Sequence, residues 1–176
     1  MKIDHPGAHL DHMLRQTRMN HLQLSSMADL KANMLLTMAS VLAGLTAPHI
    51  TQEHLKWPVL ILLTFCLVTI LLAAISAMPR VRNRRGGAQP DPKSSGFNIL
   101  FFGDFSQLDF KKFEGAMEEL MNDPSQTYEA QVRDIYLLGK YLADRKYRLL
   151  RLAYIAFISG LVISGGLLVF SGAVVF

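Results

Sequence analysis

The chain has 176 residues, of which 51% are hydrophobic, and its formal net charge is +4. The hydrophobic share is close to that of soluble domains, but the charged residues are distributed very unevenly. Three stretches contain no Asp, Glu, Lys or Arg, namely Ala32–Gln52, Trp57–Met78 and Leu152–Phe176. This segregation excludes a soluble globular domain, and a single cysteine, Cys66, excludes a disulfide-bonded scaffold. The sequence therefore predicts a small membrane protein that crosses the bilayer several times.

The first predicted element is an N-terminal cytoplasmic helix within residues 1–31. Its apolar and small residues recur at alternating spacings of four and three, which is typical of one helical face. The residues on this face are Leu10, Leu14, Thr17, His21, Leu24 and Ala28. We expect this helix to run almost continuously into the first membrane segment.

A membrane hairpin is predicted for residues 32–78, and its first segment, Ala32–Ile50, is the more polar one. About 20 helical residues span a bilayer, so this segment is long enough, although a re-entrant or interfacial position is an alternative. One helical face carries Asn33, Thr37, Ser40 and Gly44. This face either packs against another helix or lines a water-filled pore. Three helices are too few to enclose a pore, so a pore requires several subunits.

Two ridges of small residues also predict close packing of membrane helices. One ridge lies on the first membrane segment and the other on the third, Leu152–Phe176. The ridges are Ala39, Ala43 and Ala47, and Ala156, Gly160 and Ser164. We expect them to make contacts between membrane helices in a cyclic homo-oligomer, with a tetramer as the expected size.

The basic residues predict the orientation of the chain in the membrane. Of the 18 Lys and Arg residues, 17 lie in residues 1–31 or 79–151, and the loop at 51–56 holds one. Because basic residues accumulate on the cytoplasmic side, we expect the N-terminus and residues 79–151 to be cytoplasmic. The 51–56 loop and Phe176 are then expected on the opposite side.

The cytoplasmic region after the hairpin begins with residues 79–96, whose Gly, Pro, Ser and Arg content predicts a flexible basic linker. Its basic run fits either a topology signal beside anionic lipid or a phosphate-binding patch. That run consists of Arg80, Arg82, Arg84 and Arg85. The following aromatic segment, Phe97–Phe105, is too short to span and must be buried on the membrane interface, on the cytoplasmic helices or on a partner.

Two helices are predicted in the remainder of residues 97–151. Ser106 with Asp109 resembles a capping box and predicts the start of the first helix, which Asn122-Asp123-Pro124 ends. Ser125 is expected to cap the second helix. This helix continues without a Gly-Pro break into the third membrane segment at residues 152–176, so the last helix is expected to be long.

No sequence motif for a phosphate loop, a dinucleotide site, a metalloprotease or a catalytic nucleophile is present, so we expect no catalytic residues, no metal and no enzyme activity. Basic and aromatic residues near the third membrane segment suit a nucleotide, with the phosphate on Arg or Lys and the base on an aromatic ring. The same basic and aromatic residues equally suit a solvated face beside the membrane. Asp29 and Lys31 also have two interpretations: an ion pair at the membrane interface, or part of a ligand or gating site. The candidate ligand-binding residues are Asp29, Lys31, Phe102, Arg133, Tyr136, Lys140 and Lys146.

Several separated motifs resemble one known family. They are Ala28–Leu36 (ADLKANMLL), Asn98–Asp104 (NILFFGD), Tyr128 with Arg133–Tyr136 (RDIY), and Lys146–Tyr154 (KYRLLRLAY). In this order they are similar to the transmembrane effector of Pycsar, the pyrimidine cyclase system for antiphage resistance. The resemblance covers roughly Leu14 to Val169.

The resemblance implies a bacterial inner-membrane effector of abortive infection that pairs with a nucleotide cyclase or a nucleotidyltransferase. Such an effector senses a nucleotide messenger and impairs the membrane. The resemblance therefore favours the pore interpretation of the first membrane segment and the nucleotide-binding interpretation of the basic and aromatic residues. Cyclic UMP, cyclic CMP and oligonucleotides remain open as the messenger, and no other cofactor is expected. The overall prediction is an all-α integral membrane protein with about three transmembrane helices, cytoplasmic helical arms, and partners that include the lipid bilayer and further copies of itself. The alternative is a membrane scaffold that recruits a partner without forming a pore.

Overall fold

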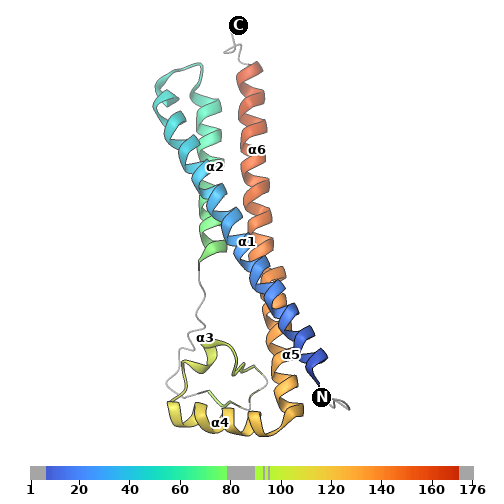
Figure 1. Ribbon diagram of the computed structural model, residues 1–176. Coiled ribbons are helices and arrows are strands. Elements are labelled where there is room, and N and C mark those ends of the chain that lie inside the picture. The colour runs from blue at the N-terminus through green and yellow to red at the C-terminus, as the bar shows by residue number, and fades with distance from the viewer. Residues whose placement is uncertain (1–6, 79–89, 93, 95, 171–176) are drawn as a thin grey trace. The chain divides into compact units, whose positions relative to one another are not determined.

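The computed structural model describes residues 7–78, 90–92, 94 and 96–170, and every regular element in these ranges is helical (Figure 1). The elements are α1 (Ala8–Thr46), a 3-10 turn η1 (Ala47–Thr51), α2 (Lys56–Ala77), α3 (Phe102–Phe105), α4 (Phe110–Asn122), α5 (Pro124–Tyr141), a π-helical turn η2 (Leu142–Tyr147) and α6 (Arg148–Phe170). The predicted all-α fold is therefore confirmed.

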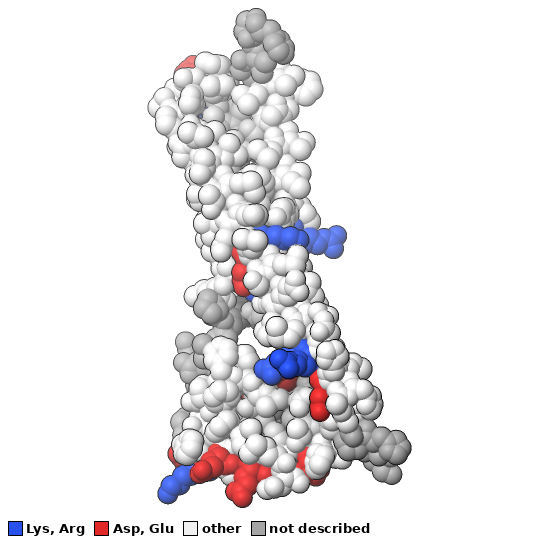
Figure 2. Space-filling view, in the orientation of Figure 1, with Lys and Arg blue, Asp and Glu red and all other residues white. Residues whose placement is uncertain are grey.

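Three helical stretches are long and apolar enough to cross a membrane. They are Ala8–Thr51 with a mean hydropathy of 1.4, Lys56–Ala77 with 2.9 and Pro124–Phe170 with 2.2. In Figure 2 the surface over the apolar parts of α1, α2 and α6 is almost free of charged side chains. The first and third stretches also include the polar helices that precede them along the chain, as the sequence analysis expected.

Prolines and an aspartate define several helix ends. The α-helical part of α1 ends at Thr46, two residues before Pro48, whose ring cannot continue an α-helix. Asp123 Oδ1 accepts hydrogen bonds from the backbone N–H groups of Ser125, at 2.9 Å, and Gln126, at 3.3 Å. The prediction that Ser125 caps α5 is therefore wrong: Pro124 takes the first helical position, so the capping residue is Asp123, two residues earlier.

The predicted helix start at Ser106 is also wrong. Ser106 is the C-cap of the short helix α3, and α4 begins at Phe110 with Asp109 as its N-cap. Asp109 has the extended backbone of an N-cap but makes no side-chain capping hydrogen bond. The pattern read as a capping box thus spans the turn between two helices.

The described residues fall into two compact units. Unit 1 comprises the described residues of 1–23 and 79–141, and unit 2 those of 24–78 and 142–176. The division of the chain at residues 31, 78, 96 and 151 stays a prediction. Most of the predicted linker, including Arg80, Arg82, Arg84 and Arg85, lies outside the described residues, as does Phe176.

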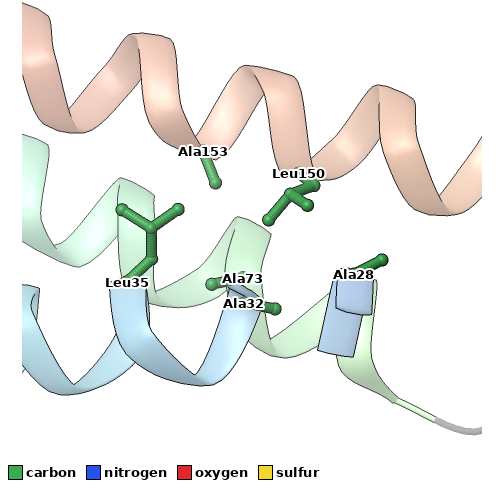
Figure 3. Close-up of a cluster of buried hydrophobic side chains, with 6 residues drawn as sticks. All are labelled: Ala28, Ala32, Leu35, Ala73, Leu150 and Ala153. Carbon is green, nitrogen blue, oxygen red and sulfur yellow. The ribbon is translucent and has the colours of Figure 1, made fainter. Parts of the chain in front are cut away.

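The core of unit 2 is built from small and branched apolar residues on three helices. Figure 3 shows Ala28, Ala32 and Leu35 of α1 facing Ala73 of α2 and Leu150 and Ala153 of α6. Small side chains let the helix backbones approach closely, which is how helices associate in a membrane. A second cluster, with Ala39, Leu62 and Cys66, continues this packing between α1 and α2.

The small-residue ridge on the third membrane segment packs inside the chain. A Cβ at Gly160 would lie 2.4 Å from Cβ of Phe65, and Ser164 Oγ donates a 2.9 Å hydrogen bond to the Pro58 carbonyl. Phe65 and Pro58 both belong to α2. Ala156, Gly160 and Ser164 are therefore buried against the chain's own hairpin, so this ridge makes the predicted contact with another membrane helix within the chain.

Candidate functional site

A buried polar network in unit 1 anchors the aromatic segment. The backbone N–H of Asn98 donates to Asp104 Oδ2 at 2.9 Å, and its side-chain amide donates to Asp134 Oδ1 at 2.8 Å. Asn98 Oδ1 accepts from the Leu100 N–H at 3.1 Å. Arg18 Nε lies 3.3 Å from Asp134 Oδ2, so this carboxylate has a cation as well as an amide partner. The network joins the 97–105 segment to α5 and to the first turns of α1.

Asn98, Asp104 and Asp134 were missed as site candidates, although two of the motifs behind the resemblance contain them. The signal available was a polar side chain at each end of an otherwise apolar run, Asn98 and Asp104 in NILFFGD. Both are buried, and buried polar groups of this kind must have partners. Gly103 completes the motif because a Cβ there would lie 2.4 Å from the ring of Phe101.

A cleft of about 410 Å³ lies beside this network in unit 1. Its volume is within the range typical of small-molecule sites. It is lined by Pro92, Phe97, Asn98, Ile99, Ala116, Glu119, Leu120, Gln126, Glu129, Ala130 and Arg133. Apolar and amide groups thus face the cleft together with two carboxylates and one guanidinium.

Arg133 is the predicted ligand-binding residue that the structure places at this cleft. Its Nη2 lies 3.3 Å from Oε1 of Glu129, and the two side chains are 40% and 45% exposed. An ion pair this exposed contributes little to stability, so an anionic ligand could displace Glu129 at small cost. Figure 2 shows acidic side chains gathered over α4, the helix that contributes Glu119 to the cleft.

The other candidates in unit 1 are not gathered at the cleft. Phe102 on α3, Tyr136 on α5 and Lys140 in the last turn of α5 are exposed, and none of them lines the cleft. Of these four residues, Arg133 alone lines this cleft.

Two candidates in unit 2 meet directly. Lys146 Nζ lies 2.7 Å from Asp29 Oδ2 and 2.8 Å from Ser25 Oγ, and the lysine side chain is only 7% exposed. The Ser76 hydroxyl donates a 3.1 Å hydrogen bond to the backbone carbonyl of Lys146. We call Ser25, Asp29, Ser76 and Lys146 the polar clasp, because it joins α1, α2 and η2.

The polar clasp neutralises two charges that the sequence analysis assigned to a ligand. Asp29 and Lys146 are partners of each other, whereas Lys31, two residues further along α1, is exposed. Asp29 Oδ1 is buried and has no hydrogen-bond partner among the residues that the structure describes. Asp29 Oδ2 thus accepts the hydrogen bond from Lys146, and Asp29 Oδ1 accepts none from the described residues.

The four predicted pore-lining residues lie on the surface of unit 2. Ala32, Leu35 and Ala39 of the same helix are buried against α2 and α6. The polar stripe lies on another face of α1, and within it Thr37 borders a groove with Phe157 of α6. The stripe consists of Asn33, Thr37, Ser40 and Gly44, all of them exposed. The Thr37 hydroxyl donates to the Asn33 carbonyl at 3.0 Å.

Comparison with known protein families gives one match. The family model described as the Pycsar effector protein domain, PycTM, matches residues 12–172. No curated protein and no solved structure matches the chain. The family match spans nearly the whole of both units.

Proposed function

The chain belongs to the Pycsar effector transmembrane family, and from this premise we propose that it is a nucleotide-regulated pore of antiphage defence. Membership implies an effector that acts at a membrane in response to nucleotide signals made by a cyclase. The pore, the messenger site and the assembly are the parts that we add. In this proposal the effector sits in the bacterial inner membrane with its N-terminus in the cytoplasm.

The observation that carries the pore proposal is the outward position of the polar stripe on α1. An amide and two hydroxyls in a membrane-spanning helix favour partners or water over lipid. The helices of the same chain do not cover them, because the alanine face of α1 is turned inward instead. In a ring of subunits that turns each stripe toward a common axis, the stripes would line a water-filled pore. We propose that this ring is a tetramer.

We place the messenger at the cleft of unit 1, with Arg133 as the phosphate-binding group. Charge-assisted hydrogen bonds from a guanidinium to phosphate are strong, and the competing Glu129 pair is exposed and weak. Phe102, Tyr136 and Lys140 remain candidates for contacts from the exposed surface of unit 1, and Lys31 from that of unit 2. A messenger opens the pore only through a higher affinity for the open arrangement of subunits.

Dye release from proteoliposomes, measured with a panel of cyclic CMP, cyclic UMP and cyclic oligonucleotides, tests this proposal. Thr37→Val should reduce nucleotide-triggered release severalfold. Thr64→Val is the matched control, because Thr64 is also exposed and its hydroxyl donates to a carbonyl four residues back, at 2.9 Å, but on α2. Arg133→Ala should abolish the nucleotide response, whereas Arg15→Ala, an exposed arginine of α1, should retain it.

Three outcomes would count against the proposal. Equal effects of Thr37→Val and Thr64→Val would mean that the polar stripe of α1 does not line the pore. A normal nucleotide response of Arg133→Ala would mean that Arg133 does not bind the messenger. A chain that inserts correctly but never releases dye with any nucleotide would favour the membrane scaffold.

A further inference from the structure

The chain contains a π-helical turn, η2, between α5 and α6. Such turns are rare, and most are single wide turns that hold one extra residue within an α-helix. The sequence of η2, LADRKY, contains no Gly or Pro, and Leu, Ala, Arg and Lys are all strong α-helix formers. Local preference therefore favours an ordinary α-helix here, so tertiary contacts must hold the wider turn.

Two such contacts converge on one residue of η2. The side chain of Lys146 is held by Asp29 and Ser25 of α1, and its backbone carbonyl accepts the hydroxyl hydrogen of Ser76 at the end of α2. The Lys146 carbonyl thus accepts a hydrogen bond from outside its own helix, and its ammonium group is held by a second helix. The polar clasp thus acts at the place where the helix departs from its local preference.

Release of these contacts has a defined geometric result. If η2 becomes α-helical, the extra residue of the wide turn joins the regular helix. Because each residue of an α-helix turns by about 100°, the helix on one side of η2 then rotates by about 100° relative to the other side. The helical stretch Pro124–Phe170 runs through η2 without interruption. Residues on either side of the turn would then present different faces.

We propose that η2 is a register switch and that the polar clasp holds it in the π-helical, resting form. All hydrogen bonds of the polar clasp are made between residues of the chain, so the π-helical form is stable without a ligand. Messenger binding would release the clasp and allow η2 to become α-helical. The role of the switch in opening rests on the proposed pore, but the change of register is a property of the helix itself.

The test compares two serines of equal burial. Ser76 and Ser164 are each 3% exposed, and each hydroxyl donates to a backbone carbonyl on another part of unit 2, at 3.1 Å and 2.9 Å. Only Ser76 acts on η2. Ser76→Ala should therefore increase the population of the α-helical register about fivefold, the effect of losing roughly one hydrogen bond, whereas Ser164→Ala should not.

The register is measured without reference to pore activity. Spin labels at Leu137 and Leu152, both exposed on the continuous helix, report its register through their distance distribution in nanodiscs, with Cys66→Ala as the background. Asp29→Asn, which weakens the ion pair, should shift the distribution in the same direction as Ser76→Ala. An unchanged distribution in both variants would overturn the switch.

Deletion of the exposed residue Ala143 distinguishes a switch from simple stabilisation of the bundle. Removing one residue makes the helix α-helical while its flanks keep the faces that they present now. In this background Ser76→Ala should have no further effect on the label distances or on nucleotide-independent dye release. If Ser76→Ala acts equally in both backgrounds, the clasp only stabilises the bundle and the switch is refuted. If the distances shift as expected but no dye is released, the switch stands and the proposed pore fails.

Discussion

At the scale of single residues, the most consequential finding is that polar side chains in apolar surroundings are paired with each other. Asn98 uses its backbone N–H and both ends of its amide, and it joins Asp104 to Asp134. In unit 2, Lys146 takes Asp29 as its partner. Buried polar groups are costly when one partner is removed, so these residues should be intolerant of substitution even if they never touch a ligand.

Asn98→Ala tests this statement. The substitution leaves the Leu100 N–H and Asp134 Oδ1 without their amide partner, which should cost about 1–3 kcal/mol of unfolding free energy. The measurement is denaturant unfolding of the detergent-solubilised chain, with Asn122→Ala, at the exposed end of α4, as the control. Equal stability of the two variants would mean that the network contributes nothing.

At the scale of elements, each helix begins and packs for a reason visible in its ends and faces. Asp123 caps α5, and the α2–α6 interface requires Gly160. The hydrogen bonds that Asp123 accepts from the Gln126 side chain and from backbone N–H groups lower the pKa of its carboxyl. Both features lead to predictions that separate a local effect from a general loss of structure.

The pH dependence of α5 should follow the cap. Because the folded-state pKa of Asp123 is lowered, its carboxylate contributes stability above the ordinary Asp pKa, and this is lost as the pH falls through the lowered value. Asp123→Asn keeps an acceptor at the N-cap but no charge. Thermal unfolding followed by circular dichroism should therefore show a lower Tm for Asp123→Asn at neutral pH and no difference from the wild type in strong acid. A constant difference at all pH values would contradict this.

Gly160→Ala should separate α6 from α2. Its new Cβ would lie 2.4 Å from Cβ of Phe65, an atom that cannot move without the helix, so a loss of about 1–3 kcal/mol is expected. Gly166→Ala is the matched control on the same helix, because its Cβ would meet nothing within 4 Å and alanine is the better helix former. Thermal unfolding in detergent should rank Gly160→Ala below the wild type and Gly166→Ala at or above it.

At the scale of the whole molecule, three apolar stretches alternate with charged regions, and this order determines how the chain can cross a membrane. The helical stretches that contain the three candidate spans are Ala8–Thr51, Lys56–Ala77 and Pro124–Phe170. We predict that all three cross, and an odd number of crossings puts the regions that flank the first and the last crossing on opposite sides. The basic residues concentrate in residues 1–31 and 79–151, which predicts that these regions are cytoplasmic.

Labelling with a membrane-impermeant maleimide tests this topology in spheroplasts. On a Cys66→Ala background, a cysteine at the exposed residue Met121 of α4 should be labelled only after lysis, because residues 79–151 are predicted to be cytoplasmic. A cysteine at the exposed residue Gln52 should be labelled in intact spheroplasts. The reverse pattern would invert the orientation.

The sequence by itself determined the three spans, the all-α fold and the family. Hydrocarbon excludes charge over any stretch of about 20 residues, and prolines end helices through their own rings, so these features depend on neighbouring residues alone. The helical end of α1 before Pro48 and of α4 before Pro124 follows directly. The polar stripe on α1 could also be recognised, since a helical face is a matter of spacing.

Only the tertiary structure decided which of these groups meet. Lys146 and Asp29 are 117 positions apart, and Asn98 and Asp134 are 36 apart, so no local pattern pairs them. The inward alanine face of α1 and the contact of Gly160 with Phe65 are likewise properties of three helices packed together. The π turn η2 is a further case, because its residues favour an α-helix and the groups that contact its Lys146 are distant in the chain.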